Sequence, residues 1–403
     1  MTVVKLSPSE TYEFITRALA VRQVPYVAGP PAIGKSQVVH QVADDANALM
    51  IDMRLSQKLS EDLTGLPERD AKRGKAIYLP FEDIPLEGDP LPGQTFDDQG
   101  KELTPATHAG WLLFLNELSS ATEEVLAAAY SLILDRMVGG KKLHPKCLVV
   151  AAGNRASDSA IARELPDTLI TRMLPCEMKV NTKDWLLWAS GSKHSNEAVV
   201  DFINKNPNKL YAHVEQKARE ELETYPTPRG WEKVFAHVNA HEKLCQQNYK
   251  PPVDAAGIPM QADPNDKGLM PIDEITFHLI SAAVGPMAAQ AFREEYDEAI
   301  QLPYPWEVAQ SPNSCRIPSS GVGKAKLTTE LAKFYLESDS QSRDAVLSYI
   351  NRVGGEFTEL FFNTLKKSMG NTPSDMKLLD MIQKRLSIDP LLGTGGSSSG
   401  GSF

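Results

Sequence analysis

Short, unbroken apolar runs recur through the first half of the chain, and helix-like patterns separate them. They lie at 24–28, 48–53, 111–115, 147–152 and near 173–178. Runs of this length are typical of strands buried on both faces, and their alternation with helical segments predicts a parallel sheet covered by helices. The expected fold class is α/β, with a three-layer αβα core.

From about residue 182 the strand pattern stops and only helical spacing remains, which indicates a change of domain. Helices are predicted at 182–190, 195–205, 229–245, 274–299, 326–337, 341–353, 355–369 and 374–386. Segments 250–272 and 303–325 are rich in proline and glycine and are predicted as loops or linkers. The predicted parts of the chain are 1–181, 182–310, 311–390 and a flexible Gly/Ser tail at 391–403.

Composition places the chain among globular proteins of two or three domains, with 403 residues, 42% hydrophobic and 23% charged. No apolar run of membrane-spanning length and no signal sequence is found, and the four cysteines have no paired spacing, so we expect a cytoplasmic protein with reduced thiols and no membrane partner. The eight histidines predict no zinc site. A net charge of −10 argues against a surface built to neutralise nucleic acid, although local basic patches could still do so.

Residues 29–36 read GPPAIGKS, the complete G-x-x-x-x-G-K-[ST] pattern, between a predicted strand and a predicted helix. The loop consists of Gly29, Pro30, Pro31, Ala32, Ile33, Gly34, Lys35 and Ser36. Its glycines let backbone N–H groups face phosphate oxygens, and the helix that follows presents its positive end to the same anion. Lys35 would contact the β- and γ-phosphates and Ser36 would bind Mg²⁺, so the sequence predicts a nucleoside triphosphate and Mg²⁺ as cofactors.

Polar residues end two later strands of the predicted sheet. Asn116 and Glu117 follow the run 111–115, and Asn154 follows the run 147–152. Strand ends are where open α/β sheets bind ligands. Glu117 could polarise a water that attacks the γ-phosphate, or could merely cap the helix at 121–136. Asn154 could hold that water or sense the phosphate, or could be an ordinary turn residue.

Several ordered motifs together resemble an AAA+ ATPase of the MoxR type: GPPAIGKS, WLLFLNELSSATEEVLAAAYSLILDR, CLVVAAGNRASD, LPDTLITRM and YPTPRGW. The resemblance runs from residue 5 to about 245 and more loosely over 275–370. It implies a three-layer αβα P-loop AAA+ core with a parallel sheet, followed by an all-helical lid and a helical C-terminal extension. It also implies roles for single positions: Walker A at 29–36, Walker B at Asn116 and Glu117, sensor 1 at Asn154, the arginine finger at Arg172 and sensor 2 at Arg229.

Both arginines have a physical rationale beside the resemblance. A guanidinium group neutralises charge on the γ-phosphoryl group and can be supplied by a neighbouring subunit, which would be the role of Arg172. Arg136, Arg155 and Arg163 compete for it, and a surface ion pair is the alternative for all four. Pro226 and Pro228 fix the entry into the helix that carries Arg229.

One position departs from the family pattern, because Asn116 stands where a carboxylate is usual. An amide oxygen can still accept a hydrogen bond from metal-bound water, but it adds no negative charge, so Mg²⁺ affinity should fall. We expect ATP to bind and Glu117 to support slow hydrolysis.

Two basic segments are candidates for contact with a partner. Arg69, Lys72, Arg73 and Lys75 lie in 59–75, which is either a solvated charged loop or, by resemblance, an insertion facing the channel of a ring. Lys141, Lys142 and Lys146 flank a Gly-Gly predicted to form a tight hairpin turn. Trp185 and Trp188 are predicted to form one helix face in the lid core.

The leading interpretation is an ATP-driven, Mg²⁺-dependent ring, expected to be a hexamer of this chain, that remodels a protein client. The resemblance implies a client that carries a von Willebrand A domain. One alternative is a nucleic-acid motor that uses the basic segments, and another is a nucleotide-gated scaffold with little hydrolysis, prompted by Asn116. A small-molecule kinase is the least favoured.

Overall fold

Six strands form one parallel sheet in the computed structural model, in the order β1-β12-β2-β11-β8-β3. Their bounds are β1 Lys5–Leu6, β2 Pro25–Ala28, β3 Ala48–Arg54, β8 Gly110–Asn116, β11 Cys147–Gly153 and β12 Leu174–Met178. The five strands predicted from apolar runs are therefore confirmed, and so is their parallel direction. The short β1 was not predicted, since two residues make no pattern.

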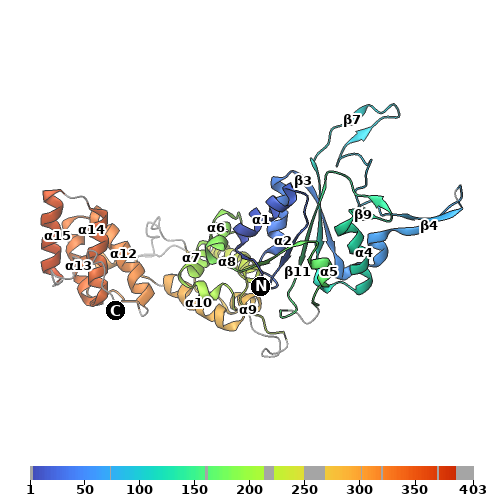
Figure 1. Cartoon of the computed structure of the whole chain (residues 1–403). Helices are drawn as coiled ribbons and strands as arrows, with labels where there is room; N and C mark the ends of the chain where they lie inside the picture. Colours follow the sequence, from blue (N-terminus) through green and yellow to red (C-terminus); the bar gives the residue numbers. More distant parts are fainter. Residues whose placement is uncertain are drawn as a thin grey trace, which may run out of the picture. The chain divides into compact units, whose positions relative to one another are not determined.

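Helices cover both faces of this sheet, which confirms the three-layer α/β class (Figure 1). On one face α1 (Pro8–Ala20) and α2 (Lys35–Asp45) pack on alternate residues of the central strands, among them Val27, Phe114 and Val150. On the other face α4 (Glu123–Leu134) packs on the residues between, such as Leu113 and Ala151. Because both faces are buried, every residue of β8 from Gly110 to Leu115 is buried, which explains its unbroken apolar run.

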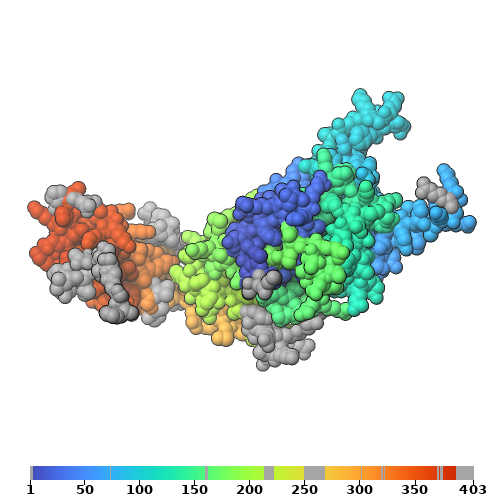
Figure 2. Space-filling model, in the orientation of Figure 1, coloured from blue at the N-terminus to red at the C-terminus, as the bar shows by residue number. Residues whose placement is uncertain are grey.

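Three two-stranded hairpins extend from this layered body. They are β4–β5 (Leu66–Asp70 and Lys75–Leu79), β6–β7 (Thr95–Phe96 and Glu102–Thr104) and β9–β10 (Met137–Val138 and Lys141–Lys142). Figure 1 shows β4 and β7 projecting as separate arms, and Figure 2 shows that both arms stand clear of the body. Segment 59–75 is largely exposed, as the solvated charged-loop interpretation expected, but it is not a loop, because it contains helix α3 (Ser60–Thr64) and most of the β4–β5 hairpin.

The predicted Gly-Gly turn is confirmed. Gly139 and Gly140 both have positive φ, 56° and 79°, as a two-residue hairpin turn between β9 and β10 requires. Lys141 and Lys142 on β10 are exposed.

The structure describes residues 3–72, 74–158, 162–212, 222–248, 268–300, 302–318, 321–369 and 372–386. The chain divides into two units, Met1–His237 with Ala282–Ala288, and Val238–Ser281 with Ala289–Phe403. The predicted domain limits at 181, 310 and 390 stay predictions. Arg73, the tail 391–403 and most of the predicted loop 250–272 lie outside the described residues.

The predicted helices are present with two corrections. They are α6 Thr182–Gly191, α7 Glu197–Lys205, α8 Pro228–Asn248, α9 Glu274–Val284, α10 Pro286–Ile300, α12 Gly321–Glu337, α13 Ser340–Val353, α14 Glu356–Ser368 and α15 Pro373–Arg385. The single helix predicted at 274–299 breaks at Gly285, whose φ is +82° and where a Cβ would come within 2.6 Å of the Thr224 carbonyl oxygen. The predicted loop 303–325 is also wrong in part, because it holds α11 (Pro305–Gln310) and the start of α12.

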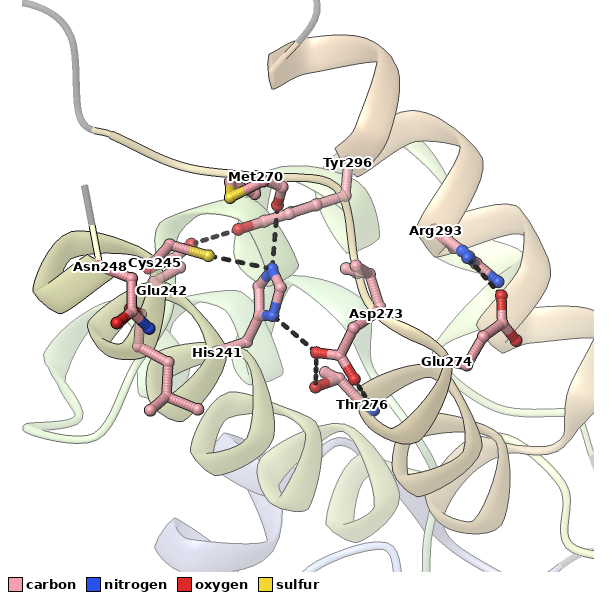
Figure 3. Close-up of polar contacts among 12 residues, drawn as sticks. His241, Glu242, Cys245, Asn248, Met270, Asp273, Glu274, Thr276, Arg293 and Tyr296 are labelled. Atoms are coloured by element: carbon pink, nitrogen blue, oxygen red, sulfur yellow. Dashed lines mark hydrogen bonds and ion pairs between the residues drawn. The ribbon is translucent and has the colours of Figure 1, made fainter. Parts of the chain in front are cut away.

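The second unit contains an apolar core and, elsewhere in its described residues, a set of polar contacts around a buried histidine. Helices α11 to α15 enclose an apolar core that includes Leu331, Tyr335, Ile350 and Phe361. Around α8, the buried His241 contacts the Asp273 carboxylate through Nδ1 (3.1 Å) and the Met270 carbonyl oxygen through Nε2 (2.9 Å) (Figure 3). Within the part of the chain that the structure describes, no helix is long and apolar enough to cross a membrane.

Candidate functional site

The loop Gly29–Gly34 joins β2 to α2 at the centre of the sheet. Gly29 is required by close approach, because a Cβ there would lie 2.7 Å from the Met178 carbonyl oxygen of the neighbouring strand. Gly34 has φ +97° and directly precedes α2, so its backbone conformation strongly favours glycine. The loop thus wraps the N-terminus of a helix of 11 residues, where unpaired N–H groups attract anions.

Lys35 joins this loop to the end of another strand. Its ammonium donates three hydrogen bonds, to the carbonyl oxygens of Gly29 (2.8 Å) and Pro30 (2.7 Å) and to Oδ1 of Asn154 (2.8 Å). Asn154 directly follows β11, which pairs with β2. Two residues 119 positions apart are therefore in direct contact, at the edge where the sequence placed both.

The environment of Lys35 brings further predicted residues to the same place. Burial lowers the pKa of Lys35 to about 7, and the carboxylates of Asp158 and Glu117 raise this pKa against the effect of burial. The guanidinium groups of Arg229 and Arg155 lower the pKa further. Four charged groups from three separate segments thus act on one ammonium.

Glu117 follows β8 in a left-handed backbone conformation, with φ 58°, which costs a non-glycine residue roughly 1 kcal/mol. Its carboxylate Oε2 accepts a hydrogen bond from the Ser56 hydroxyl, at the end of β3. The Asn116 side chain folds back on the neighbouring main chain, since its Oδ1 accepts the Glu117 N–H at 3.0 Å. Glu117 is therefore held at both its main chain and its side chain.

Arg229 lies in the first turn of α8, next to the phosphate-loop residues. Thr227 caps this helix by accepting the Gly230 N–H at 2.9 Å, and the Arg229 N–H donates to the Ala32 carbonyl oxygen at 3.2 Å. Pro228 is buried, whereas Arg229 is exposed. Pro228 is the first residue of α8, a position that proline favours, and the role of the two prolines in fixing Arg229 stays a prediction.

Arg172 lies apart from the contacts that join the other predicted site residues. It is exposed in the turn after α5 (Asp167–Ile170), and its Nη1 donates to the Thr168 carbonyl oxygen at 2.8 Å. Among the described residues, it forms no hydrogen bond or ion pair with Lys35, Glu117 or Asn154 of its own chain.

The competing arginines have other partners. Arg155 donates to Glu177 through Nη1 (2.8 Å) and to Asp158 through Nη2 (2.7 Å). Its guanidinium is therefore held by two carboxylates beside the site. Arg136 donates to the Cys147 carbonyl oxygen, and the exposed Arg163 pairs with Glu123 at 3.6 Å.

A pocket of about 560 Å³ adjoins the phosphate loop. Its lining comes from α1, α2, α6 and α8 and includes Tyr12, Gly34, Ser36, His40, Trp185, Trp188 and Arg229. Two hydrogen bonds join α1 to α6 in the lining of this pocket, because the Ser9 N–H (2.9 Å) and hydroxyl (2.8 Å) both donate to Asp184 Oδ2. The pocket has room for a planar ring system beside the anion site.

Trp185 and Trp188 pack as predicted and also line this pocket. Both rings lie against Phe235, with centroids 5.8 Å and 6.5 Å away. The spacing of the two tryptophans, three residues apart on α6, predicts core packing. It gives no separate sign that they also line a pocket. The sequence also missed Ser56, because a lone serine after a strand carries no pattern.

The donor set suits a Mg²⁺ ion that takes most of its ligands from elsewhere. Within the described ranges no three His, Cys, Asp or Glu side chains gather as metal ligands. Mg²⁺ usually keeps several waters and takes phosphate oxygens beside one or two protein ligands. Ser36 and the second lone pair of Asn116 Oδ1, acting through water, fit that need.

Comparisons with known proteins add little. No family model matches the chain, and no curated protein matches it. Among solved structures, the chain is similar to a proposed ATPase from Cytophaga hutchinsonii (TM-score 0.30, 9% identity, 95% of this chain and 90% of that one). It is also similar to NtrX from Brucella abortus (TM-score 0.29, 13% identity, 91% and 68%).

Proposed function

We propose that this chain is a Mg²⁺-dependent AAA+ ATPase of the MoxR type. The observation that carries the proposal is the contact of Lys35 with Asn154, beside charged groups from Glu117 and Arg229. A phosphate loop, a carboxylate at a strand end, an amide at the next strand end and an arginine at a helix start are the parts that phosphoryl transfer needs. The adjoining pocket would take the base.

Triphosphate binding would exchange the partners of Lys35. In the described state its three protons bond to neutral oxygens, two of them in the loop. A phosphate oxygen is a stronger, charged acceptor, so the ammonium would turn to the β- and γ-phosphates. Asn154 Oδ1 would then be free to orient the attacking water.

Glu117 would act as the general base on that water. Because Ser56 holds Oε2, Oε1 remains to accept the proton as the water attacks the γ-phosphorus. Bound Mg²⁺ would neutralise charge on the β- and γ-phosphate oxygens. Arg229 would contact the phosphates from the N-terminus of α8.

We expect the pH dependence of ATP affinity to reveal Lys35. In the free protein its pKa is about 7, and a bound triphosphate raises that pKa, so binding above pH 7 must take up a proton. Affinity should fall from pH 7 to pH 9 at a rate approaching about tenfold per pH unit, and this group should add no dependence below pH 7. Titration calorimetry in two buffers of different ionisation enthalpy measures the proton uptake. An affinity that stays flat from pH 7 to pH 9 would contradict the role of Lys35.

We propose further that Arg172 completes the site of a neighbouring subunit in a ring, with a hexamer expected. Its exposure, and its hydrogen bond to Thr168 and to none of Lys35, Glu117 and Asn154 among the described residues, suit action on another chain. Arg172→Ala should keep ATP binding and lower hydrolysis by roughly 10³-fold, the contribution typical of such an arginine. Arg163→Ala, which removes another exposed guanidinium of the same region, should have little effect.

Mixing identifies a shared site. Arg172→Ala and Glu117→Gln chains should each hydrolyse little ATP alone, but a mixed ring would contain interfaces with an intact Glu117 on one side and an intact Arg172 on the other. Phosphate release should therefore recover in part on mixing. Absence of recovery at every mixing ratio would count against shared sites.

The client is proposed to be a protein, and the resemblance suggests one with a von Willebrand A domain. The projecting β4–β5 arm and the exposed Lys141 and Lys142 are suited to contact it. A nucleic-acid client would instead show activation of hydrolysis by DNA with a steep salt dependence. One observation supports the scaffold alternative. Asn116 Oδ1 accepts the Glu117 N–H, so one of its two lone pairs is not available to a metal-bound water.

A further inference from the structure

Ser119 is a buried hydroxyl that the proposed chemistry does not use. It lies in η2 (Leu118–Ser120), two residues beyond Glu117, and only 2% of its surface is exposed. A buried hydroxyl must find hydrogen-bond partners, and the identity of these partners is informative.

Two hydrogen bonds join this hydroxyl to one residue, Asn154. Ser119 Oγ accepts the Asn154 N–H at 3.0 Å and donates to the Asn154 carbonyl oxygen at 2.8 Å. One side chain from the end of β8 therefore fixes the peptide groups on both sides of Asn154, at the end of β11. The Asn154 side chain is in turn the one that holds Lys35.

The surroundings leave little room for another arrangement. A Cβ on Gly153 would lie 2.7 Å from Ser119 Oγ and 2.7 Å from the Tyr26 hydroxyl oxygen, so glycine is required there. Burial raises the pKa of Tyr26 to about 12, an effect that a hydrogen bond with Ser119 reduces. Tyr26 belongs to β2, which leads into the phosphate loop. The Ser119 carbonyl oxygen also accepts the Arg163 N–H at 2.8 Å.

We infer that Ser119 is a positioning residue that sets Asn154 relative to Glu117 and to the phosphate loop. It links the segments that follow β8 and β11 and contacts Tyr26 within β2, and each of these three adjacent strands leads into one part of the site. Through this link, contact of Asn154 with the terminal phosphate and activation of water by Glu117 depend on one geometry. The inference rests on the proposed ATPase function.

The test compares Ser119→Ala with Ser120→Ala, which makes the same change at the next residue of η2. Phosphate release gives kcat, and competition with a fluorescent nucleotide gives the affinities for ATP and ADP. Ser119→Ala should lower kcat roughly 10- to 100-fold, because small misplacements of reacting groups cost this much. Its preference for ATP over ADP should shrink while ADP affinity stays unchanged, whereas Ser120→Ala should match the unmodified protein.

A second variant disturbs the contact between Ser119 and Asn154 from the β11 side. Gly153→Ala should reproduce the loss of kcat, and the double variant should be no worse than the worse single variant, since both changes remove one linked interaction. If Ser119→Ala reduces the yield of folded protein, Ser119→Cys takes its place. The thiol is a weaker donor and acceptor of similar size, so an intermediate loss of kcat is expected.

The outcomes separate this inference from the function on which it rests. If the unmodified protein hydrolyses ATP and Ser119→Ala keeps both kcat and the preference for ATP, the positioning role is wrong and the ATPase stands. Additive losses in the double variant would also overturn the positioning role. If the unmodified protein binds no nucleotide, the proposed function is wrong and this inference with it.

Discussion

Glu117→Gln is expected to abolish phosphate release while ATP still binds. The amide keeps the size of the side chain and can still contact Ser56, but it cannot accept a proton from water. Loss of a general base costs about 10²- to 10⁴-fold in rate, which would bring a slow ATPase to the limit of detection. Steady-state phosphate release and nucleotide affinity, measured on the same preparation, check both parts.

Glu82→Gln is the matched control for this variant, because Glu82 is an exposed residue outside the site. It should hydrolyse ATP at the unmodified rate. Equal, near-zero rates for the unmodified protein and Glu117→Gln would favour the nucleotide-gated scaffold.

Lys35→Ala should remove measurable nucleotide binding. In the bound state the ammonium would make charge-assisted hydrogen bonds to the β- and γ-phosphates, each worth about 1.5–3 kcal/mol. Losing two of them corresponds to a loss of affinity of at least roughly 100-fold, since about 1.4 kcal/mol is a factor of ten. Titration calorimetry with ATP and Mg²⁺ measures this directly.

Lys141→Ala is the matched control for Lys35→Ala. Lys141 is exposed on β10, so its removal changes net charge equally without touching the loop. ATP affinity should be unchanged in this control. An unaltered affinity in Lys35→Ala itself would refute the assignment of residues 29–36 as the phosphate-binding loop.

The sheet could be predicted from the sequence because its strands are buried on both faces. β8 and β11 therefore read as continuous apolar runs, which few other structures produce. The hairpin arms could not be predicted in the same way. β4 and β5 are exposed along most of their length, so burial imposes no apolar pattern on them: β4 reads LPERD, and the apolar residues of β5, KAIYL, are too few to mark a strand.

Site residues could be predicted only where they belong to a sequence motif, or follow a strand that the sequence itself predicts. The phosphate loop, Glu117 and Asn154 each follow a strand, and parallel strands bring such positions to one edge. The roles of Ser56 and Ser119 depend instead on which strands are neighbours and in which register. One serine in a sequence is compatible with many structures, and only the packed sheet selects its partners.

The sequence also gave no sign of the Cys245, His241 and Asp273 cluster. Cys245 Sγ lies 3.5 Å from His241 Nε2, and Asp273 is on Nδ1, which places the three residues in the order of a cysteine hydrolase triad. The chemistry differs, because Nε2 is also directed at the Met270 carbonyl oxygen, which can only accept. Nε2 is therefore engaged with this carbonyl oxygen and is not free to accept a proton from the buried thiol.

The most direct measurement of the central claim is a structure of the protein with Mg²⁺ and a non-hydrolysable ATP analogue. We expect the phosphates in the loop at 29–36, Lys35 Nζ bonded to them and no longer to Asn154, and Glu117 facing the terminal phosphate. A nucleotide bound elsewhere, or a terminal phosphate that Lys35, Glu117 and Asn154 do not surround, would contradict the account.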